Sequence, residues 1–138
     1  MITSISKNHK GLVTITGPTR SGKSQLAEFL IKEQESVTYI ATSKPRPNDI
    51  DWNRRINVHK KRRPDCWTLL EHPSDICKSI ESLGSEQSIL IDSLGGLVEH
   101  HLIENEFQWE IFQNKLVNCL KDKFLCIVVA EEVGWGIV

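Results

Sequence analysis

The sequence predicts an α/β protein whose mostly parallel sheet is covered by helices, and three observations support this prediction. The β-branched runs are continuously apolar, which is typical of strands buried on both faces. These runs alternate with segments whose apolar residues recur at helical spacing. The chain has 138 residues, of which 39% are hydrophobic and 25% charged, so residues 1–138 are expected to form one globular domain.

The first three predicted elements are a strand, a helix and a strand. Residues 12–16, LVTIT, form a β-branched run that ends at Gly17, and they predict a buried strand before a tight turn. Apolar residues then recur at helical spacing, so a helix is expected from about Lys23 until just before Ser36. Residues 37–41, VTYIA, predict the second strand. A right-handed crossover through the helix would make it the parallel neighbour of the first strand.

The middle of the chain is expected to be less regular. Residues 44–50 carry two prolines and predict a loop. A charged segment follows, and we interpret it as a helix that frays into a basic loop by about Arg63. Residues 67–70 are a strand candidate, and Pro73 is expected to open a helix.

Two further strands and one helix are predicted in the last third of the chain. Residues 88–92, SILID, and residues 124–130, FLCIVVA, are continuous apolar runs of strand length. Between them, a helix over about residues 107–120 would place apolar side chains in one stripe. That stripe comprises Phe107, Ile111, Phe112, Leu116 and Leu120. His100 and His101 precede this helix and are interpreted as surface or interface residues.

The composition excludes several classes of protein. There are 17 Lys and Arg against 18 Asp and Glu, for a formal net charge of −1, which argues against a domain that binds nucleic acid. The four cysteines show no CxxC spacing and are interpreted as reduced, structural residues. The N-terminal residues lack the apolar core of a signal peptide, and no segment reaches about 18 uninterrupted apolar residues. A cytoplasmic protein without a membrane segment is therefore expected.

The octapeptide GPTRSGKS matches the phosphate-loop pattern GxxxxGK[ST], and it lies between a predicted strand and a predicted helix, as this motif requires. Its glycines let backbone N–H groups face a phosphate, and the start of the helix adds the positive end of its dipole. The lysine can reach the β- and γ-phosphates of a nucleoside triphosphate, and the last serine can ligate Mg²⁺. The predicted phosphate-binding residues are Gly17, Pro18, Thr19, Arg20, Ser21, Gly22, Lys23 and Ser24.

A second magnesium ligand is predicted at Asp92, which ends the apolar run SILID. An aspartate in this position, with Ser93 following, is also common as a turn or N-cap residue. The phosphate loop favours the metal role, so Ser24 and Asp92 are predicted as the metal ligands.

Residues 54–63 contain six Lys or Arg, and His59 lies among them. One interpretation of His59 is a solvated surface residue. The other is a nucleophile, because neighbouring cations lower the pKa of about 6.5 and keep the imidazole neutral. A neutral imidazole can attack an activated phosphate, and the same cations would neutralise a triphosphate. A nucleic-acid contact would favour interleaved aromatic residues, and Trp67 is the only one nearby on the C-terminal side.

Together these stretches resemble the bifunctional adenosylcobinamide kinase and adenosylcobinamide-phosphate guanylyltransferase family of cobalamin biosynthesis. The resemblance follows the chain in order through GPTRSGKS at 17–24, VTYIATS at 37–43, RINVHKKRRPDCW at 55–67, LIDSL at 90–94 and EEVGWGIV at 131–138. It implies a P-loop NTPase domain of the RecA-like type and a homo-oligomer such as a homotrimer. It also implies a further helix and strand after the GIV end, so the chain is expected to be C-terminally truncated.

The resemblance also implies the reactions and the residues that serve them. ATP or GTP would phosphorylate the side-chain hydroxyl of adenosylcobinamide, a corrinoid. His59 would then take GMP from GTP as a covalent intermediate and pass it on to give adenosylcobinamide-GDP. The other residues implied at the nucleotide or its Mg²⁺ are Ala41, Thr42, Ser43, Lys60, Lys61, Arg62, Arg63, Glu71 and Asp92. Two alternatives stay open at this point: a small-molecule kinase without a covalent step, and a nucleotide-binding protein inactive through truncation.

Overall fold

The computed structural model describes residues 10–18 and 20–131, which include one five-stranded sheet. Its strands are β1 (Gly11–Gly17), β2 (Val37–Ala41), β3 (Thr68–Glu71), β4 (Ser88–Asp92) and β5 (Leu125–Glu131). They lie in the order β1-β5-β4-β2-β3, and every pairing is parallel. The predicted α/β class with a parallel sheet is confirmed. The prediction that β2 neighbours β1 is wrong, because β5 and β4 lie between them.

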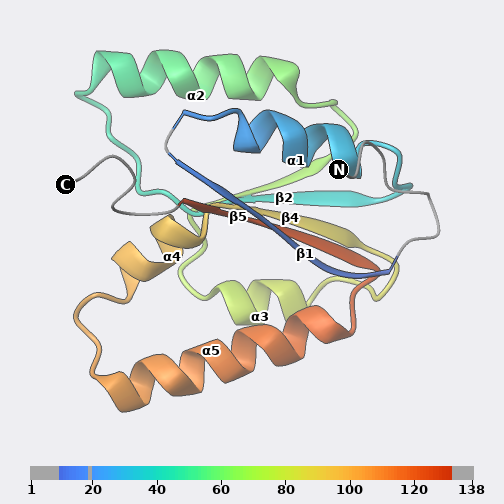
Figure 1. Cartoon of the computed structure of the whole chain (residues 1–138), viewed down its shortest axis with the longest axis vertical. Helices are drawn as coiled ribbons and strands as arrows, with labels where there is room; N and C mark the ends of the chain where they lie inside the picture. The colour runs from blue at the N-terminus through green and yellow to red at the C-terminus, as the bar shows by residue number, and fades with distance from the viewer. Residues whose placement is uncertain (1–9, 19, 132–138) are drawn as a thin grey trace.

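Helices cover both faces of this sheet (Figure 1). α1 (Lys23–Ile31) and α2 (Ile50–Arg62) lie over one face, and α3 (Ile76–Glu81), α4 (Leu94–His100) and α5 (Glu106–Lys121) lie over the other. Within the described part of the chain, no helix has the length and apolar character that a membrane span requires.

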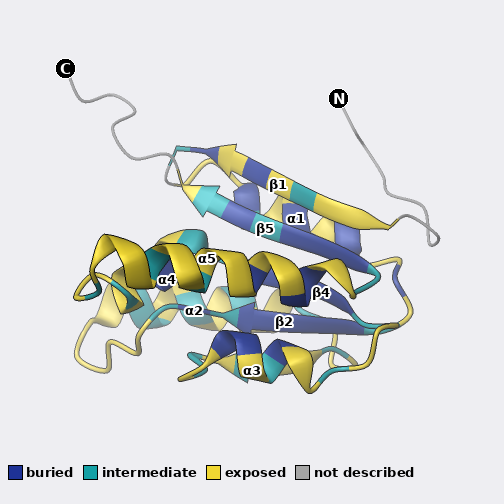
Figure 2. Ribbon diagram, turned by 90° about the horizontal axis from the view of Figure 1, so that it is seen from below, coloured by how far each residue is buried: buried dark blue, intermediate teal, exposed yellow. Residues whose placement is uncertain are grey.

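The central strands contribute to two apolar cores, one on each face of the sheet. In β4, Leu90 packs in one core with Leu30 and Ile31 of α1. Ile89 and Ile91 point the other way, into a core built with α3 and α5. Figure 2 shows the consequence, because β2 is buried along most of its length while β1 alternates between exposed and buried residues. Burial on both faces explains why the inner strands are continuously apolar.

The predicted helix is confirmed in the charged segment, but it continues through the basic run to Arg62 where the sequence predicted fraying into a loop. Asp49 caps the N-terminus of α2 by accepting a hydrogen bond from the backbone N–H of Trp52 at 2.9 Å. At the other end, Arg63 donates to the backbone carbonyl of His59 at 3.1 Å. Because both ends of the helix are satisfied by side chains, α2 continues to Arg62.

Two other helices differ from the prediction. α3 begins at Ile76 behind the N-cap Asp75, not at Pro73. α4 was not predicted, since two glycines in LGGLVEH lower its helix propensity. Packing explains the glycine at position 96, because a Cβ on Gly96 would lie 2.2 Å from the hydroxyl oxygen of Thr42. α4 can therefore approach the end of β2 closely.

The stripe predicted for α5 is only half buried. Leu116 and Leu120 lie in the core, but Phe107 is 71% exposed and Ile111 46% exposed. The first turns of α5 lie beyond the carboxyl ends of the strands, so they have no sheet beneath them (Figure 1).

The histidine pair and the cysteines have definite places in this fold. His101 stacks on Phe112 with ring centroids 3.9 Å apart, and its Nδ1 lies 2.8 Å from a carboxylate oxygen of Glu104. His101 is therefore partly buried against α5, whereas His100 is exposed. All four cysteines are free thiols, as predicted.

Candidate active site

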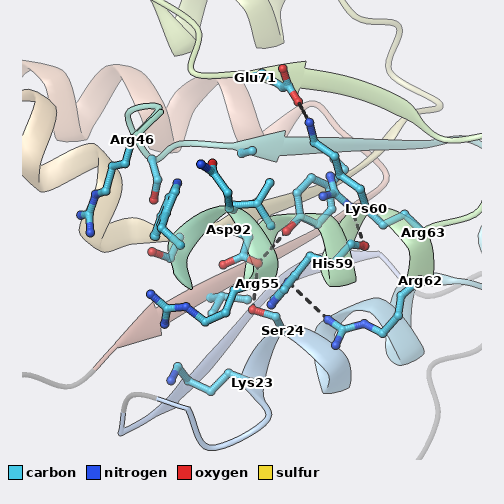
Figure 3. A pocket seen from close by; sticks show the side chains of 18 of the residues that line it. Lys23, Ser24, Arg46, Arg55, His59, Lys60, Arg62, Arg63, Glu71 and Asp92 are labelled. Atoms are coloured by element: carbon cyan, nitrogen blue, oxygen red, sulfur yellow. Dashed lines mark hydrogen bonds and ion pairs between the residues drawn. The ribbon is translucent and has the colours of Figure 1, made fainter. Parts of the chain in front are cut away.

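A cavity of about 580 Å³ lies where the phosphate loop, the carboxyl ends of β2 and β4 and one face of α2 come together (Figure 3). Ligands of open parallel sheets bind beyond the carboxyl ends of the strands, so this is the expected position for a site. The predicted residues that line it are Arg20, Ser21, Gly22, Lys23, Ser24, Ala41, Ser43, His59, Lys60, Arg62, Arg63, Glu71 and Asp92. Gly17, Pro18, Thr42 and Lys61 do not line it, and Thr19 and the segment 132–138 lie outside the described residues.

The phosphate loop turns directly into α1. Gly22 has a φ of 86°, in the left-handed region where a side chain would be strained, and Lys23 is the first residue of the helix. The lysine is buried, and its ammonium donates to the backbone carbonyl of Pro18 and lies 3.4 Å from the hydroxyl oxygen of Ser21. These contacts hold the cation over the loop, where the phosphates of a nucleotide would approach the helix N-terminus.

Ser24 and Asp92 meet across the cavity although 68 residues separate them. The Ser24 hydroxyl donates to Oδ2 of Asp92 at 2.8 Å, and the Tyr39 hydroxyl donates to the same oxygen at 2.6 Å. Burial, followed by the neighbouring Asp92 charge, raises the pKa of Tyr39, so its hydroxyl stays protonated and remains a donor. A hydroxyl and a carboxylate in contact beside a phosphate loop are oxygen ligands of the kind Mg²⁺ takes from proteins.

Thr42 supports this arrangement without lining the cavity. Its backbone N–H donates to the carbonyl of Asp92 at 3.1 Å, and its hydroxyl donates to the carbonyl of Ser93 at 2.6 Å. The backbone N–H of Ser93 donates back to the Thr42 hydroxyl oxygen at 2.9 Å. These bonds tie the ends of β2 and β4 together, which fixes the position of the Asp92 carboxylate.

One face of α2 forms the wall opposite the phosphate loop. The residues of this helix and its C-cap that line the cavity are Trp52, Asn53, Arg55, Ile56, His59, Lys60, Arg62 and Arg63. Their spacing of three to four residues is that of a single helical face. Lys61 lies on the opposite face, which is why it does not line the cavity with its neighbours.

His59 points into the cavity and is surrounded by cations. Nη2 of Arg62 lies 3.3 Å from its Nδ1, as the dashed line in Figure 3 marks. Burial lowers the pKa of His59, and Arg62, Arg63 and Arg55 lower it further, against an opposing effect of Asp92. The imidazole is therefore neutral at pH 7, which is the form that can act as a nucleophile.

Lys60 and Glu71 lie at the rim of the cavity. The Lys60 ammonium is 3.1 Å from a carboxylate oxygen of Glu71, and both side chains are about half exposed. This pair joins α2 to the end of β3, and its solvent exposure limits its contribution to stability to at most about 1 kcal/mol.

Several residues of the site were not predicted from the sequence. Tyr39 was interpreted only as part of a strand, and Glu28, which pairs with Arg62, only as part of a helix. Trp52 and Arg55 lie two turns and one turn before His59, respectively, on the same helical face, and this spacing is the signal that would have identified them. Over residues 10–18 and 20–131, no group of three or more His, Cys, Asp or Glu is arranged to hold a metal ion.

Comparisons with known proteins found a family model and curated relatives that match most of the chain. Residues 13–138 match a family model described as cobinamide kinase / cobinamide phosphate guanyltransferase. The chain is 34% identical over 128 residues to the bifunctional adenosylcobalamin biosynthesis protein CobP of Pseudomonas aeruginosa. The aligned region covers 90% of this chain and 73% of that protein. It is 32% identical to CobU of Salmonella typhimurium, over 92% of this chain and 78% of the relative.

A solved structure also resembles the chain at a lower level. The flagellar accessory protein FlaH of Methanocaldococcus jannaschii superimposes with a TM-score of 0.45 and 16% identity, over 90% of this chain and 62% of that chain.

Proposed function

The chain belongs to the cobinamide kinase / cobinamide phosphate guanyltransferase family, and we propose on this premise that it catalyses both reactions of that name. It would phosphorylate the hydroxyl of a cobinamide with ATP or GTP, and then transfer GMP from GTP to the new phosphate. The observation that carries the proposal is the shared cavity: Lys23, Ser24 and Asp92 line it together with His59. One bound triphosphate would thus lie within reach of both kinds of chemistry.

In the kinase reaction, Lys23 and the backbone N–H groups of the phosphate loop bind the β- and γ-phosphates. The corrinoid hydroxyl oxygen attacks the γ-phosphorus and releases its proton to water, the bond between that phosphorus and the β-phosphate oxygen breaks, and the nucleoside diphosphate leaves. Arg20 and Arg63, which also line the cavity, would neutralise charge that develops on the transferred phosphoryl group.

In the guanylyl transfer, a nitrogen lone pair of His59 attacks the α-phosphorus of GTP. A phosphorus–nitrogen bond forms, the bond to the β-phosphate oxygen breaks, and pyrophosphate leaves. A phosphate oxygen of the phosphorylated corrinoid then attacks the same phosphorus, and the neutral imidazole is released. Two displacements through a covalent intermediate replace one more difficult step. The ring nitrogen that carries hydrogen keeps its proton throughout.

Mg²⁺ is proposed as the metal, held by the hydroxyl oxygen of Ser24 and the carboxylate of Asp92 together with phosphate oxygens. When bound, it neutralises charge on the phosphates and orients them. The hydrogen bond between Ser24 and Asp92 already holds these two oxygens 2.8 Å apart, and the donor from Tyr39 keeps the carboxylate in that position.

Labelling with GTP that carries an isotope in its α-phosphate tests this function. We expect an acid-labile label on the wild-type protein and none on His59→Ala, while His59→Ala keeps its kinase activity. His100→Ala is the matched control, because this exposed histidine does not line the cavity. Label that persists in His59→Ala would contradict the assignment of the nucleophile. Kinase activity with no label on the wild type would instead favour a kinase without a covalent step.

We also propose, from the family resemblance, that adenosylcobinamide is the corrinoid substrate and that the chain forms a homo-oligomer such as a homotrimer. Phosphorylation assays with adenosylated and non-adenosylated cobinamide test the first point. Sedimentation equilibrium tests the second, and a mass equal to that of one chain would contradict it.

A further inference from the structure

Glu28 is a buried carboxylate with no part in the proposed reactions. It lies in the middle of α1, one helical turn after Ser24, and is 8% exposed. Its Oε2 accepts a hydrogen bond from Nε of Arg62 at 3.1 Å, whereas its buried Oε1 has no partner. A buried charged group requires an opposite charge. The ion pair with Glu28 of α1 therefore holds the Arg62 side chain in place.

The same guanidinium also contacts the proposed nucleophile. Arg62 reaches Glu28 through Nε and approaches Nδ1 of His59 through Nη2, at 3.3 Å. It therefore bridges α1 and α2 and links the carboxylate to the imidazole. The Arg62 side chain is 28% exposed and the Glu28 side chain 10% exposed, so the ion pair is partly buried, whereas the contact with His59 is open to solvent.

The chemistry of arginine determines what this contact does to the imidazole. A guanidinium has five N–H donors and no acceptor, so Nδ1 of His59 must accept. A neutral imidazole that accepts at Nδ1 carries its proton on Nε2. In this arrangement neither nitrogen is ready to attack phosphorus, because one lone pair is engaged by Arg62 and the other nitrogen is protonated.

We propose that Arg62, anchored by Glu28, is a positioning residue that fixes His59 in the Nε2–H tautomer and covers its Nδ1 lone pair until an anionic phosphate draws the guanidinium away. A phosphate offers the planar guanidinium a bidentate partner with more charge than a neutral imidazole has. Departure of Nη2 uncovers the Nδ1 lone pair, and the proton stays on Nε2 when that lone pair attacks. The nucleophile is thus exposed only when a phosphate is present.

This inference rests on the proposed function for its purpose, but its test does not require guanylylation. Two-bond ¹⁵N–¹H spectra of histidine-labelled protein report which ring nitrogen carries hydrogen. In the resting wild-type protein we expect His59 with hydrogen on Nε2. In Arg62→Gln and in Glu28→Gln, we expect a larger share of the Nδ1–H tautomer, because the guanidinium no longer donates to Nδ1. Two variants are used because Glu28 is buried and its substitution could disturb folding, whereas Arg62 is at the end of α2.

Arg54→Gln is the matched control, since it removes the same charge from α2 at a position outside the cavity lining. It should leave the tautomer unchanged. Tripolyphosphate, a phosphate probe without a base, should raise the Nδ1–H share of the wild type as Arg62→Gln does, with the Nε2–H form still dominant, and should have no further effect on the tautomer of Arg62→Gln.

An Nδ1–H tautomer in the resting wild type, or an unchanged tautomer in both variants, would overturn the proposal. A response of the tautomer in a protein that GTP does not label would support it while the guanylyltransferase function fails. Labelling by GTP together with a tautomer that ignores Arg62 would leave the function standing and remove this inference alone.

Discussion

α1 and α2 lie over the same face of the sheet, but they are attached to it differently. α1 buries Ala27, Leu30 and Ile31 in the core, whereas α2 buries none of its residues. Elements with few buried apolar contacts open at lower free energy than the core does. The phosphate loop is therefore joined to the firmly packed helix, and His59 is carried by the loosely packed one. We call the phosphate loop with α1 the fixed wall of the cavity and α2 the movable wall. In the proposed function, such a pair of walls would let one site present the γ-phosphate in one reaction and the α-phosphate in the other.

The largest expected effect comes from removing the cation on the fixed wall. A charge pair at about 4 Å is worth about 4 kcal/mol at an effective dielectric constant of 20. Lys23→Ala should therefore lower kcat/KM of both the kinase and the guanylylation reaction by about 10³-fold. Steady-state rates with ATP and GTP measure this, and Lys32→Ala, an exposed lysine just after α1, should remain near wild type. A loss below tenfold in Lys23→Ala would mean that this lysine does not bind the phosphates.

A pair of core and surface substitutions measures the different attachment of the two helices. Ile31 is fully buried, so Ile31→Ala should lower the free energy of unfolding by about 3 kcal/mol. Val58 on the outer face of α2 is 55% exposed, and Val58→Ala should change it by less than about 0.5 kcal/mol. Denaturant unfolding gives both values. Equal losses would show that α2 is packed as firmly as α1, and the comparison would fail.

The wall formed by the phosphate loop and α1 was largely predictable from the sequence, whereas for α2 the sequence predicted a helix and His59 but not the extent of the helix or the face that it presents. GPTRSGKS carries its chemistry in contiguous residues, and the apolar runs on either side place it between a strand and a helix. α2 buries none of its residues and has almost no apolar stripe. Periodicity therefore could not distinguish a helix from a loop in its basic C-terminal part. Only the structure shows that His59 and Arg62 share one face while Lys61 points away.

Two residues depend on contacts that no local pattern encodes. Tyr39 donates to Asp92, 53 residues away, and Glu28 pairs with Arg62, 34 residues away. Their positions follow from the strand order, which places β4 beside β2, and from the position of α2 over the same face of the sheet as α1. The sequence assigned β2 a neighbour in β1 and assigned no neighbour to β4, so it did not predict that Tyr39 and Asp92 meet.

The N-caps of α2 and α3 provide a smaller test of the same comparison. Asp49→Ala removes the side chain that caps α2, which should cost about 1 kcal/mol. Because α2 buries no residue, the loss should be local: amide exchange in α2 becomes about fivefold faster, while the midpoint of global unfolding hardly moves. Asp75→Ala removes the equivalent cap of α3, whose Ile76 and Ile80 are in the core, and it should lower the global midpoint. A global loss in Asp49→Ala would contradict the loose attachment of α2.

The smallest expected effect is a shift in the acid limb of the pH profile of guanylylation, which is the pH range where the rate declines as the pH falls. The pKa of His59 is lowered from 6.5, first by burial and then by Arg62, so the imidazole stays neutral as the pH falls through 6.5 and is protonated only below the lowered value. Guanylylation should therefore decline at a pH below 6.5.

Arg62→Gln removes one cation that disfavours protonation, so the limb should move upward, toward 6.5. Burial, Arg63 and Arg55 still lower the pKa of His59 in this variant, and Asp92 still opposes them. The limb should therefore stop short of pH 6.5. Single-turnover labelling across pH, with Arg54→Gln as the control for a lost charge, measures it. A limb that moves to lower pH in Arg62→Gln would show that Arg62 does not act on His59 as a neighbouring cation.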